Sequence, residues 1–348
     1  MRQKVIQAEP AAGGVLTSRQ ISCWRNEGYT FVSGLIAGDL IAQLTQAALK
    51  QFPAPGSREA DQIRDFGSHE ALTFPSRASG FNEVTLSENL IRAVADLLGT
   101  SPDQLRLSQS DLWPKYGRSE SSDKYDNQDQ RIHVDYPNHN LAHPTPWDRP
   151  EAVELILYLS DWQETAGSTA IVPRTTNERG VDGGVTRDLT RRWPIVDSPG
   201  IADLDYVNDR AAAEAYFAKE RHNLAGHRME MYERELLTAF QPGDILFYRH
   251  DSWHRGTPTK PDQLRLAQNV TYRMAHAEWI NTLHVGWSWQ AYSKDKFLER
   301  LIATSSLLQR AVLGFPQPGS PYWCKETYDG VAARYQVFGM DMSPYRFD

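Results

Sequence analysis

The chain has 348 residues, of which 40% are hydrophobic and 23% charged, so it is long enough to bury a substantial core. Its formal net charge of -7 argues against a nucleic-acid partner, because nucleic-acid binders normally carry a basic surface. The sequence contains no apolar run of about 18 residues, so no membrane-spanning helix is expected. The first residues also lack the apolar stretch of a secretory signal. The 2 cysteines lie far apart, which favours a reducing, cytoplasmic setting over a disulfide framework.

Helical patterns dominate the first hundred residues, after an expected flexible tail at residues 1–14. Two capping boxes, TSRQ and TLSE, and two glycines support this interpretation, since such boxes begin helices and glycine often ends them. The predicted helices run from Thr17 to Gly28, from about Asp39 to Lys50 and from Thr85 to Gly99. Residues 52–82 are rich in Pro, Gly and Ser and predict a loop.

From Leu105 the apolar repeat changes from about 3.6 to 2 residues, which predicts strands. Strand signals lie at residues 105–113, 131–136, 153–160, 168–172, 244–249 and 264–273. Helices followed by several short strands predict an α+β fold, and we expect a jelly-roll core, the cupin-like double-stranded β-helix, flanked by helices.

We expect one domain over residues 15–348, interrupted by a helical insertion at about 174–240. The insertion is charged and prone to helix formation, and it lies between barrel strands, so we expect it to act as a lid over a pocket. A helical C-terminal extension is predicted at about 288–348 and matches no activity that the sequence identifies. Several aromatic residues are candidates to line a pocket, although core packing is the plainer interpretation: Phe81, Trp113, Tyr136, Trp147, Trp253 and Trp287.

The strongest local signal is the motif His133-Val134-Asp135. Residues two apart on a strand point to the same face, so His133 and Asp135 would converge inside a barrel. A second histidine would complete the two-His-one-carboxylate triad that binds iron(II) and leaves positions open for a co-substrate and dioxygen. We place this ligand at His254, which precedes a glycine-containing turn, rather than at the neighbouring His250. The same three ligands also suit zinc, and the motif occurs on half-buried strands that bind no metal.

The strand predicted at 264–273 carries a candidate anchor for an acid. Arg265 lies on its polar face, 11 residues after His254, where a guanidinium group can hold a carboxylate by two parallel hydrogen bonds. Gln109 and Lys115 share one face of the strand that begins at Leu105 and would add polar contacts to the same acid. The ordinary alternatives are a solvated strand face for Arg265 and an exposed loop start for Lys115.

These motifs, in this order, resemble the phytanoyl-CoA dioxygenase-like branch of the iron(II)/2-oxoglutarate oxygenases. The resemblance covers about residues 15–275 and rests on the segments EGYTFVSGLI, HVD, GSTAIVP and PGDILFY and on the spacing of His254 and Arg265. It implies that His133, Asp135 and His254 bind iron(II) and that Arg265 binds the far carboxylate of 2-oxoglutarate. Gln109 and Lys115 match positions that often contact this co-substrate.

The chain departs from the family's pattern at three places. Ile132 replaces the aromatic residue before the first histidine, and Arg174 stands where the family commonly has Gly-Ser after the proline. Gly256 occupies the place of a small hydroxyl residue, with Thr257 one position further on, so we take Thr257 as the candidate co-substrate contact. These departures concern the substrate rather than the iron ligands.

The resemblance implies that dioxygen converts 2-oxoglutarate to succinate and carbon dioxide while an unactivated C–H bond of a small-molecule substrate is hydroxylated. Asp135 favours hydroxylation, with desaturation or cyclisation as variants, over halogenation, because glycine or alanine at that position would open a site for halide. Two alternatives stay open. A metal-dependent cupin-type enzyme without 2-oxoglutarate would not need Arg265, and a non-catalytic binding barrel would need neither Arg265 nor the metal.

Overall fold

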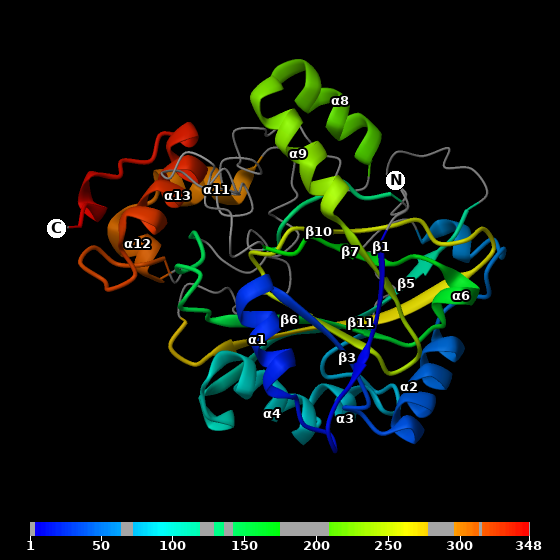
Figure 1. Cartoon of the computed structure of the whole chain (residues 1–348). Coiled ribbons are helices and arrows are strands. Elements are labelled where there is room, and N and C mark those ends of the chain that lie inside the picture. The colour runs from blue at the N-terminus through cyan, green and yellow to red at the C-terminus, as the bar shows by residue number, and fades with distance from the viewer. Residues whose placement is uncertain are drawn as a thin grey trace.

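A computed structural model describes residues 4–63, 72–118, 129–135, 142–174, 209–277, 296–312 and 315–347 of the chain. Two β-sheets lie at its centre, with helices α1–α4 below them, α8 and α9 above, and the C-terminal helices to one side (Figure 1). Within the described ranges, no helix is long and apolar enough to span a bilayer. The arrangement is α+β, as the order of helical and strand patterns predicts.

The larger sheet contains seven strands within the described residues and is mainly antiparallel. In spatial order they are β2 (Glu9–Pro10), β3 (Tyr29–Ser33), β9 (Ile245–Tyr248), β6 (Ala152–Tyr158), β11 (Leu264–Met274), β5 (Leu105–Tyr116) and β4 (Leu72–Thr73). The longest pairing joins β5 to β11, with Lys115 opposite Arg265. The strands predicted around 105, 153, 244 and 264 are therefore all present in this sheet.

The smaller sheet has four strands within the described residues. They are β1 (Lys4–Gln7), β8 (Leu236–Ala239), β7 (Thr169–Ile171) and β10 (His254–Gly256), in that spatial order. Side chains of both sheets meet between them: Ile156 and Tyr158 of β6 pack in one cluster with Ile171 of β7. On the opposite face of β6, Val153 and Leu155 pack against the helices. This alternation is what a strand buried on both faces requires.

Four helices cover the outer face of the larger sheet: α1 (Ser18–Glu27), α2 (Gly38–Gln51), α3 (Phe81–Thr85) and α4 (Glu88–Leu98). The capping box of α1 is confirmed, because Thr17 accepts from the Gln20 amide and Gln20 in turn accepts from the Thr17 amide. Gly28 ends α1 in the left-handed conformation, with φ of 88°. Short helices also occur at η1 (Ala60–Gln62), η2 (Pro102–Gln104) and α6 (Trp162–Thr165).

The predicted capping box at Thr85 is wrong. Thr85 is the last residue of α3, and its hydroxyl donates to the Phe81 carbonyl at 2.8 Å, so it is not available to cap the next helix. The residue before α4 is Ser87, whose side chain makes no capping hydrogen bond. The predicted end at Gly99 is confirmed, with φ of 70°.

Where a flexible tail was expected, the structure has two short strands, β1 and β2, from Lys4 onward. Residues of β1 pair in parallel with β8, and Glu9 and Pro10 pair with β3, so the N-terminus extends both sheets. These strands are mostly exposed, which explains why no apolar alternation marks them in the sequence.

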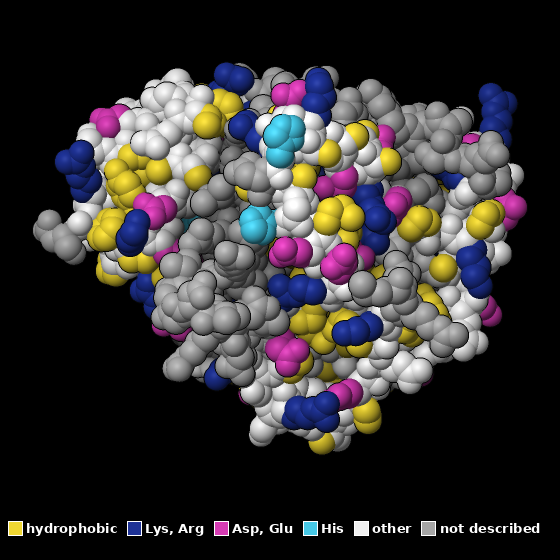
Figure 2. Space-filling view, turned by 45° about the horizontal axis from the view of Figure 1, so that its top comes forward, with side chains coloured by type: hydrophobic (Ala, Val, Ile, Leu, Met, Phe, Trp, Pro, Cys, Tyr) yellow, Lys and Arg dark blue, Asp and Glu magenta, His cyan; other side chains and the backbone are white. Residues whose placement is uncertain are grey.

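Two helical regions lie outside the sheets. The described part of the predicted insertion contains α8 (Arg210–Glu220) and α9 (His222–Arg234), whereas its residues 175–208 lie outside the described residues. The C-terminal unit, residues 296–312 and 315–347, contains α11 (Phe297–Thr304), α12 (Leu307–Val312), α13 (Lys325–Tyr335), η5 (Gln336–Phe338) and η6 (Ser343–Tyr345). It has an aromatic-rich core of its own. Figure 2 shows hydrophobic side chains on the surface of this unit, at the left of the view, and interspersed charges near α8 and α9.

Candidate metal centre

His133, Asp135 and His254 meet in a buried cluster, in which their ligand atoms all lie within 4.8 Å of one another. His254 Nε2 is 3.2 Å from Asp135 Oδ2, and His133 Nε2 is 3.6 Å from Asp135 Oδ1. The centroids of the two imidazole rings are 4.5 Å apart. No other group of three His, Cys, Asp or Glu with such spacing occurs in the part of the chain that the structure describes.

The two ligand-bearing segments meet through a backbone bridge between His133 and His254 and a further hydrogen bond, of 3.1 Å, from the Gln130 amide to the Gly256 carbonyl. His254 begins β10, and its backbone exchanges two hydrogen bonds of 2.9 Å with the backbone of His133. The prediction of a strand at 131–136 is wrong for the described residues 131–135. Only His133 forms a β-bridge there, and no strand continues from it. Instead, the amide of Ile132 donates to the hydroxyl of Tyr232 on α9, at 2.9 Å.

The tautomers of both histidines suit a metal. The Nδ1 atoms of His133 and His254 lie 2.9 Å and 3.0 Å from the carbonyl oxygens of Arg131 and Ser252, so each Nδ1 carries the proton and donates it. Burial, followed by the nearby His254 ring, lowers the pKa of His133 to about 4, so this ring is neutral near pH 7. Each Nε2 therefore presents a lone pair toward the Asp135 carboxylate, and a cation between these acceptors would satisfy all of them.

Tyr248 at the end of β9 orients the carboxylate. Its hydroxyl donates to Asp135 Oδ2 at 2.8 Å, and its ring lies 4.7 Å from the His254 ring. Beside it on β6, Glu154 is buried opposite Tyr248 in the strand register. Burial, and then the charges of Asp135 and Asp251, raise the pKa of Glu154 well above its usual range. The sequence interpretation missed both residues, although their place on interior-facing strand positions was a usable signal.

The structure brings Arg265 and Lys115 together as a pair of buried cations. They lie opposite each other on β11 and β5 and are 5% and 3% exposed. Burial, followed by the charge of Arg265, holds the pKa of Lys115 well below its usual range. Arg265 donates one hydrogen bond, of 3.1 Å, to the Gly167 carbonyl, and its Nε has no hydrogen-bond partner. No carboxylate of the described residues forms an ion pair with Arg265, so the surroundings of this guanidinium suit an added anion.

Two glycines make room around this cation pair. A Cβ on Gly167, whose φ is 72°, would lie 3.1 Å from Arg265 Cδ. A Cβ on Gly256 would lie 2.7 Å from Gln130 Oε1 and 3.2 Å from Lys115 Nζ. Gly256 is also two residues after His254 on β10, so the Lys115 ammonium lies about 7 Å along the strand from a candidate metal ligand.

The remaining co-substrate candidates, Thr257 and Gln109, have other partners. The Thr257 hydroxyl donates to the Ser168 carbonyl at 2.9 Å, and the Thr257 carbonyl accepts from Lys115 Nζ at 2.8 Å. Gln109 donates to Asp111 Oδ2 at 2.6 Å. Gln109 is six residues from Lys115, about 20 Å along β5, so the structure does not bring it to the cation pair.

His250 is a buried imidazole outside the cluster of three. It is 4% exposed, and neither ring nitrogen has a hydrogen-bond partner. Burial lowers the pKa of His250 to about 4, and the opposing effects of Asp251 and Asp135 are smaller. The ring is therefore neutral near pH 7. His250 precedes His254 by four residues, and the Asp135 carboxylate is among the charges that act on its ring.

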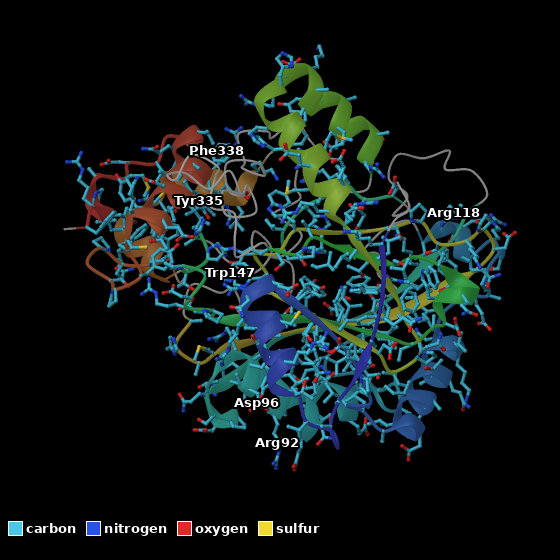
Figure 3. All side chains as sticks on the ribbon, in the orientation of Figure 1. Arg92, Asp96, Arg118, Trp147, Tyr335 and Phe338 are labelled. Atoms are coloured by element: carbon cyan, nitrogen blue, oxygen red, sulfur yellow. The ribbon has the colours of Figure 1, made fainter. Side chains whose placement is uncertain are left out.

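The aromatic candidates differ in their surroundings. Phe81 belongs to the main core, whereas Tyr136 and Trp287 lie outside the described residues. Trp147 lies between α1 and the C-terminal unit (Figure 3). Its ring is stacked between the guanidinium groups of Arg249 and Arg174, 3.6 Å and 3.7 Å from the ring centroid.

The fold is similar to that of solved structures. The non-heme alpha ketoglutarate dependent carbocyclase SnoK from nogalamycin biosynthesis matches with 15% identity and a TM-score of 0.50, over 80% of this chain and 92% of that one. EctD from S. alaskensis, in its apoform, matches with 16% identity and a TM-score of 0.50, over 82% and 86%. These likenesses confirm the predicted double-stranded β-helix fold. No protein-family model matches the sequence, and no curated protein matches it.

Proposed function

We propose that this protein is a non-haem iron(II)/2-oxoglutarate-dependent oxygenase of the phytanoyl-CoA dioxygenase-like type. The observation that carries the proposal is the close placement of two sites. The buried His-Asp-His cluster includes His254 on β10, and two residues further on a Cβ at Gly256 would lie 3.2 Å from Lys115 Nζ. Lys115 in turn lies opposite Arg265, a buried guanidinium with which no carboxylate of the described residues forms an ion pair. A diacid that reaches from the metal to Arg265 would satisfy both sites at once. We further propose that a single domain surrounds them.

In this proposal His133, Asp135 and His254 would hold the iron through two imidazole nitrogens and one carboxylate. Tyr248 keeps the Asp135 carboxylate turned toward the two histidines. Arg265 binds the far carboxylate of 2-oxoglutarate, and the buried Lys115 side chain lies opposite it on β5, where an added carboxylate would favour its charged form. Thr257 acts indirectly, because its carbonyl accepts from Lys115 and so orients the ammonium.

The bound iron supplies the activation of dioxygen, coupled to the oxidation of 2-oxoglutarate to succinate and carbon dioxide. One oxygen atom enters succinate and the other enters the product alcohol. The chain's own residues exclude water from this chemistry, since all three ligands, Arg265 and Lys115 are buried. We propose hydroxylation of a C–H bond as the outcome, because Asp135 fills the position that a halide would need.

His250 is the proposed contact for the organic substrate. A neutral imidazole with both nitrogens unpartnered offers one donor and one acceptor, and leaving both unsatisfied in a buried site costs free energy. A hydroxyl or amide group on a small molecule matches this pair. The position of His250, near Asp135 but outside the cluster of three, would bring that group beside the reacting centre.

The proposal is tested by succinate formation. The iron-loaded protein is mixed with 2-oxoglutarate and dioxygen, with no other substrate, and succinate is measured. We expect slow succinate formation that requires both iron and oxygen and that His254→Ala abolishes. Stoichiometric zinc with no succinate under iron loading would instead support a 2-oxoglutarate-independent metal enzyme.

A further inference from the structure

The Ile132 backbone, in the segment that carries His133 and Asp135, is held by two side chains of helix α9. Because this segment forms no continuous strand, Ile132 has no ladder partner. The Ile132 amide donates to the Tyr232 hydroxyl, and the Ile132 carbonyl accepts from Arg228 Nη2, both at 2.9 Å. Ile132 immediately precedes the first histidine of the cluster. Two side chains of α9 therefore fix the backbone position from which this ligand projects.

A carboxylate on α8 fixes those two side chains in turn. Glu214 Oε1 accepts from the Tyr232 hydroxyl at 2.7 Å and from Arg228 Nη2 at 2.8 Å, and Arg228 Nε lies 3.0 Å from both carboxylate oxygens. Arg228 is 0% exposed, and its guanidinium lies 4.1 Å from the centroid of the Phe217 ring. The donors that hold Ile132 are thus anchored in a buried, charge-assisted network.

The same helical pair also holds the segment that carries the other histidine. Arg255, the residue after His254, donates to both oxygens of Glu235 at the end of α9, at 2.6 Å and 3.0 Å. It donates as well to Asp129 Oδ1 at 2.5 Å, and Asp129 begins the segment that contains His133. Arg255 therefore joins α9 to both ligand-bearing segments at once.

From these contacts we propose that α8 and α9 form a clamp that sets the geometry of the metal cluster. Tyr232 and Arg228 are its positioning residues, and metal binding is thermodynamically linked to the docking of the two helices. This inference rests on the proposed metal site, though not on 2-oxoglutarate. It replaces the expectation of a lid for the described part of the insertion, because a lid would have to break this buried network in every cycle.

The C-terminal unit offers matched controls. Arg334 on α13 is 1% exposed and pairs with Glu299 at 3.4 Å, so it is a buried Arg–Glu pair like that of Arg228. Tyr345 is a buried tyrosine whose hydroxyl accepts from Arg310 at 3.1 Å. Arg334 hydrogen-bonds to Glu299, and Arg310 hydrogen-bonds to the Ile302 and Ala303 carbonyls and to Tyr345, all within this unit. Arg334→Met and Tyr345→Phe therefore repeat the loss of polar groups at a distance from the metal.

The test is a Co²⁺ titration of the full-length protein, followed by the visible absorption of the bound ion and by tryptophan fluorescence. We expect Tyr232→Phe and Arg228→Met to weaken Co²⁺ binding by about 10- to 100-fold and to change its absorption spectrum, whereas both control variants bind as the wild type does. Affinity and spectrum unchanged in Tyr232→Phe and Arg228→Met would overturn the clamp while leaving the metal site intact. Failure of the wild type to bind Co²⁺, Mn²⁺ or Fe²⁺ would overturn the proposed function itself.

A second readout uses only the wild type and so does not depend on how the variants fold. We expect Co²⁺ to slow amide hydrogen exchange in α8 and α9 by at least several-fold, since ligand binding and docking of the clamp stabilise each other. Exchange in α13 serves as the internal control and should not change. Equal exchange in α8 and α9 with and without bound Co²⁺ would overturn the linkage.

Discussion

The helical insertion and the C-terminal unit each contain a buried Arg–Glu pair but differ in what that pair contacts. Each places a buried arginine against a glutamate: Arg228 with Glu214 in the insertion, and Arg334 with Glu299 in the C-terminal unit. In the insertion the arginine also reaches the backbone beside a metal-ligand candidate. In the C-terminal unit, Arg334 belongs to a helix that packs around the unit's own aromatic core (Tyr335 and Phe338 in Figure 3).

The difference shows that a buried ion pair has no fixed role. Replacing such a pair by apolar residues often leaves stability unchanged, so its value depends on the other groups that the pair positions. Around Arg228 those groups include the Ile132 carbonyl, whereas Arg334 hydrogen-bonds to Glu299 within the C-terminal unit.

The largest effect is expected from removing a ligand. His254→Ala leaves two of three protein ligands, so we expect no measurable iron binding and complete loss of succinate formation. The difference in amide hydrogen exchange between the two helical regions should also disappear in this variant, because metal addition would no longer slow exchange in α8 and α9. Retained iron binding in His254→Ala, together with its loss in His250→Ala, would show that His250 is the ligand.

Arg265 separates the co-substrate from the clamp. Removing one partner of a buried guanidinium–carboxylate pair costs about 3–5 kcal/mol, so Arg265→Ala should weaken 2-oxoglutarate binding by roughly two to four orders of magnitude. Arg265→Lys keeps the charge without the planar fork and should fall between the two. Metal affinity and the metal-dependent protection of α8 and α9 should be unchanged in both variants. Near-normal 2-oxoglutarate affinity in Arg265→Ala would move the anchor to Arg273 on the same strand.

Double replacement of each ion pair sharpens the contrast further. We expect Glu214→Leu/Arg228→Met and Glu299→Leu/Arg334→Met to regain most of the stability that the single arginine variants lose, because no buried charge is left unpaired. The insertion variant should still bind metal about 10- to 100-fold more weakly, since the Ile132 carbonyl loses its donor on α9 and keeps only the 3.2 Å hydrogen bond from the adjacent Arg131 Nη1. Thermal unfolding and Co²⁺ titration measure the two effects. Full recovery of metal affinity in the insertion variant would make the two pairs equivalent.

The smallest effect concerns His250, the buried imidazole outside the cluster of three. His250→Leu removes two buried polar atoms that have no partner, so we expect the free energy of unfolding to stay equal or to rise by about 1 kcal/mol. Metal and 2-oxoglutarate affinities should not change. Denaturant unfolding checks this prediction, and a loss of more than about 2 kcal/mol would indicate that the ring has a structural partner.

Local signals in the sequence predicted local structure well. The capping box at Thr17 and the stops at Gly28 and Gly99 are confirmed, because each depends on residues within one or two helical turns. The N-terminal strands were not predicted, since their hydrogen-bond partners lie on β8 and β3 and their own side chains are mostly exposed. The alternation of the strand at 264–273 was visible because Leu266, Val270 and Tyr272 pack in the main core, whereas the residues between them are mostly polar.

The candidate site was predictable only in part. The motif of His133 and Asp135 suggested a shared strand face, whereas in the structure their segment is held by α9. Nothing local to Arg228 or Tyr232 indicates that contact, because charged residues on a helix usually mark a solvated face. The opposition of Lys115 and Arg265 likewise depends on the register of β5 against β11, which no short sequence pattern specifies.

An anaerobic titration of the iron-loaded protein with 2-oxoglutarate tests the central claim most directly. We expect a weak visible charge-transfer band that grows to saturation in the wild type. Arg265→Ala should not develop this band at the same 2-oxoglutarate concentration. A protein that binds iron through His133, Asp135 and His254 but gives no band at saturating 2-oxoglutarate would contradict it.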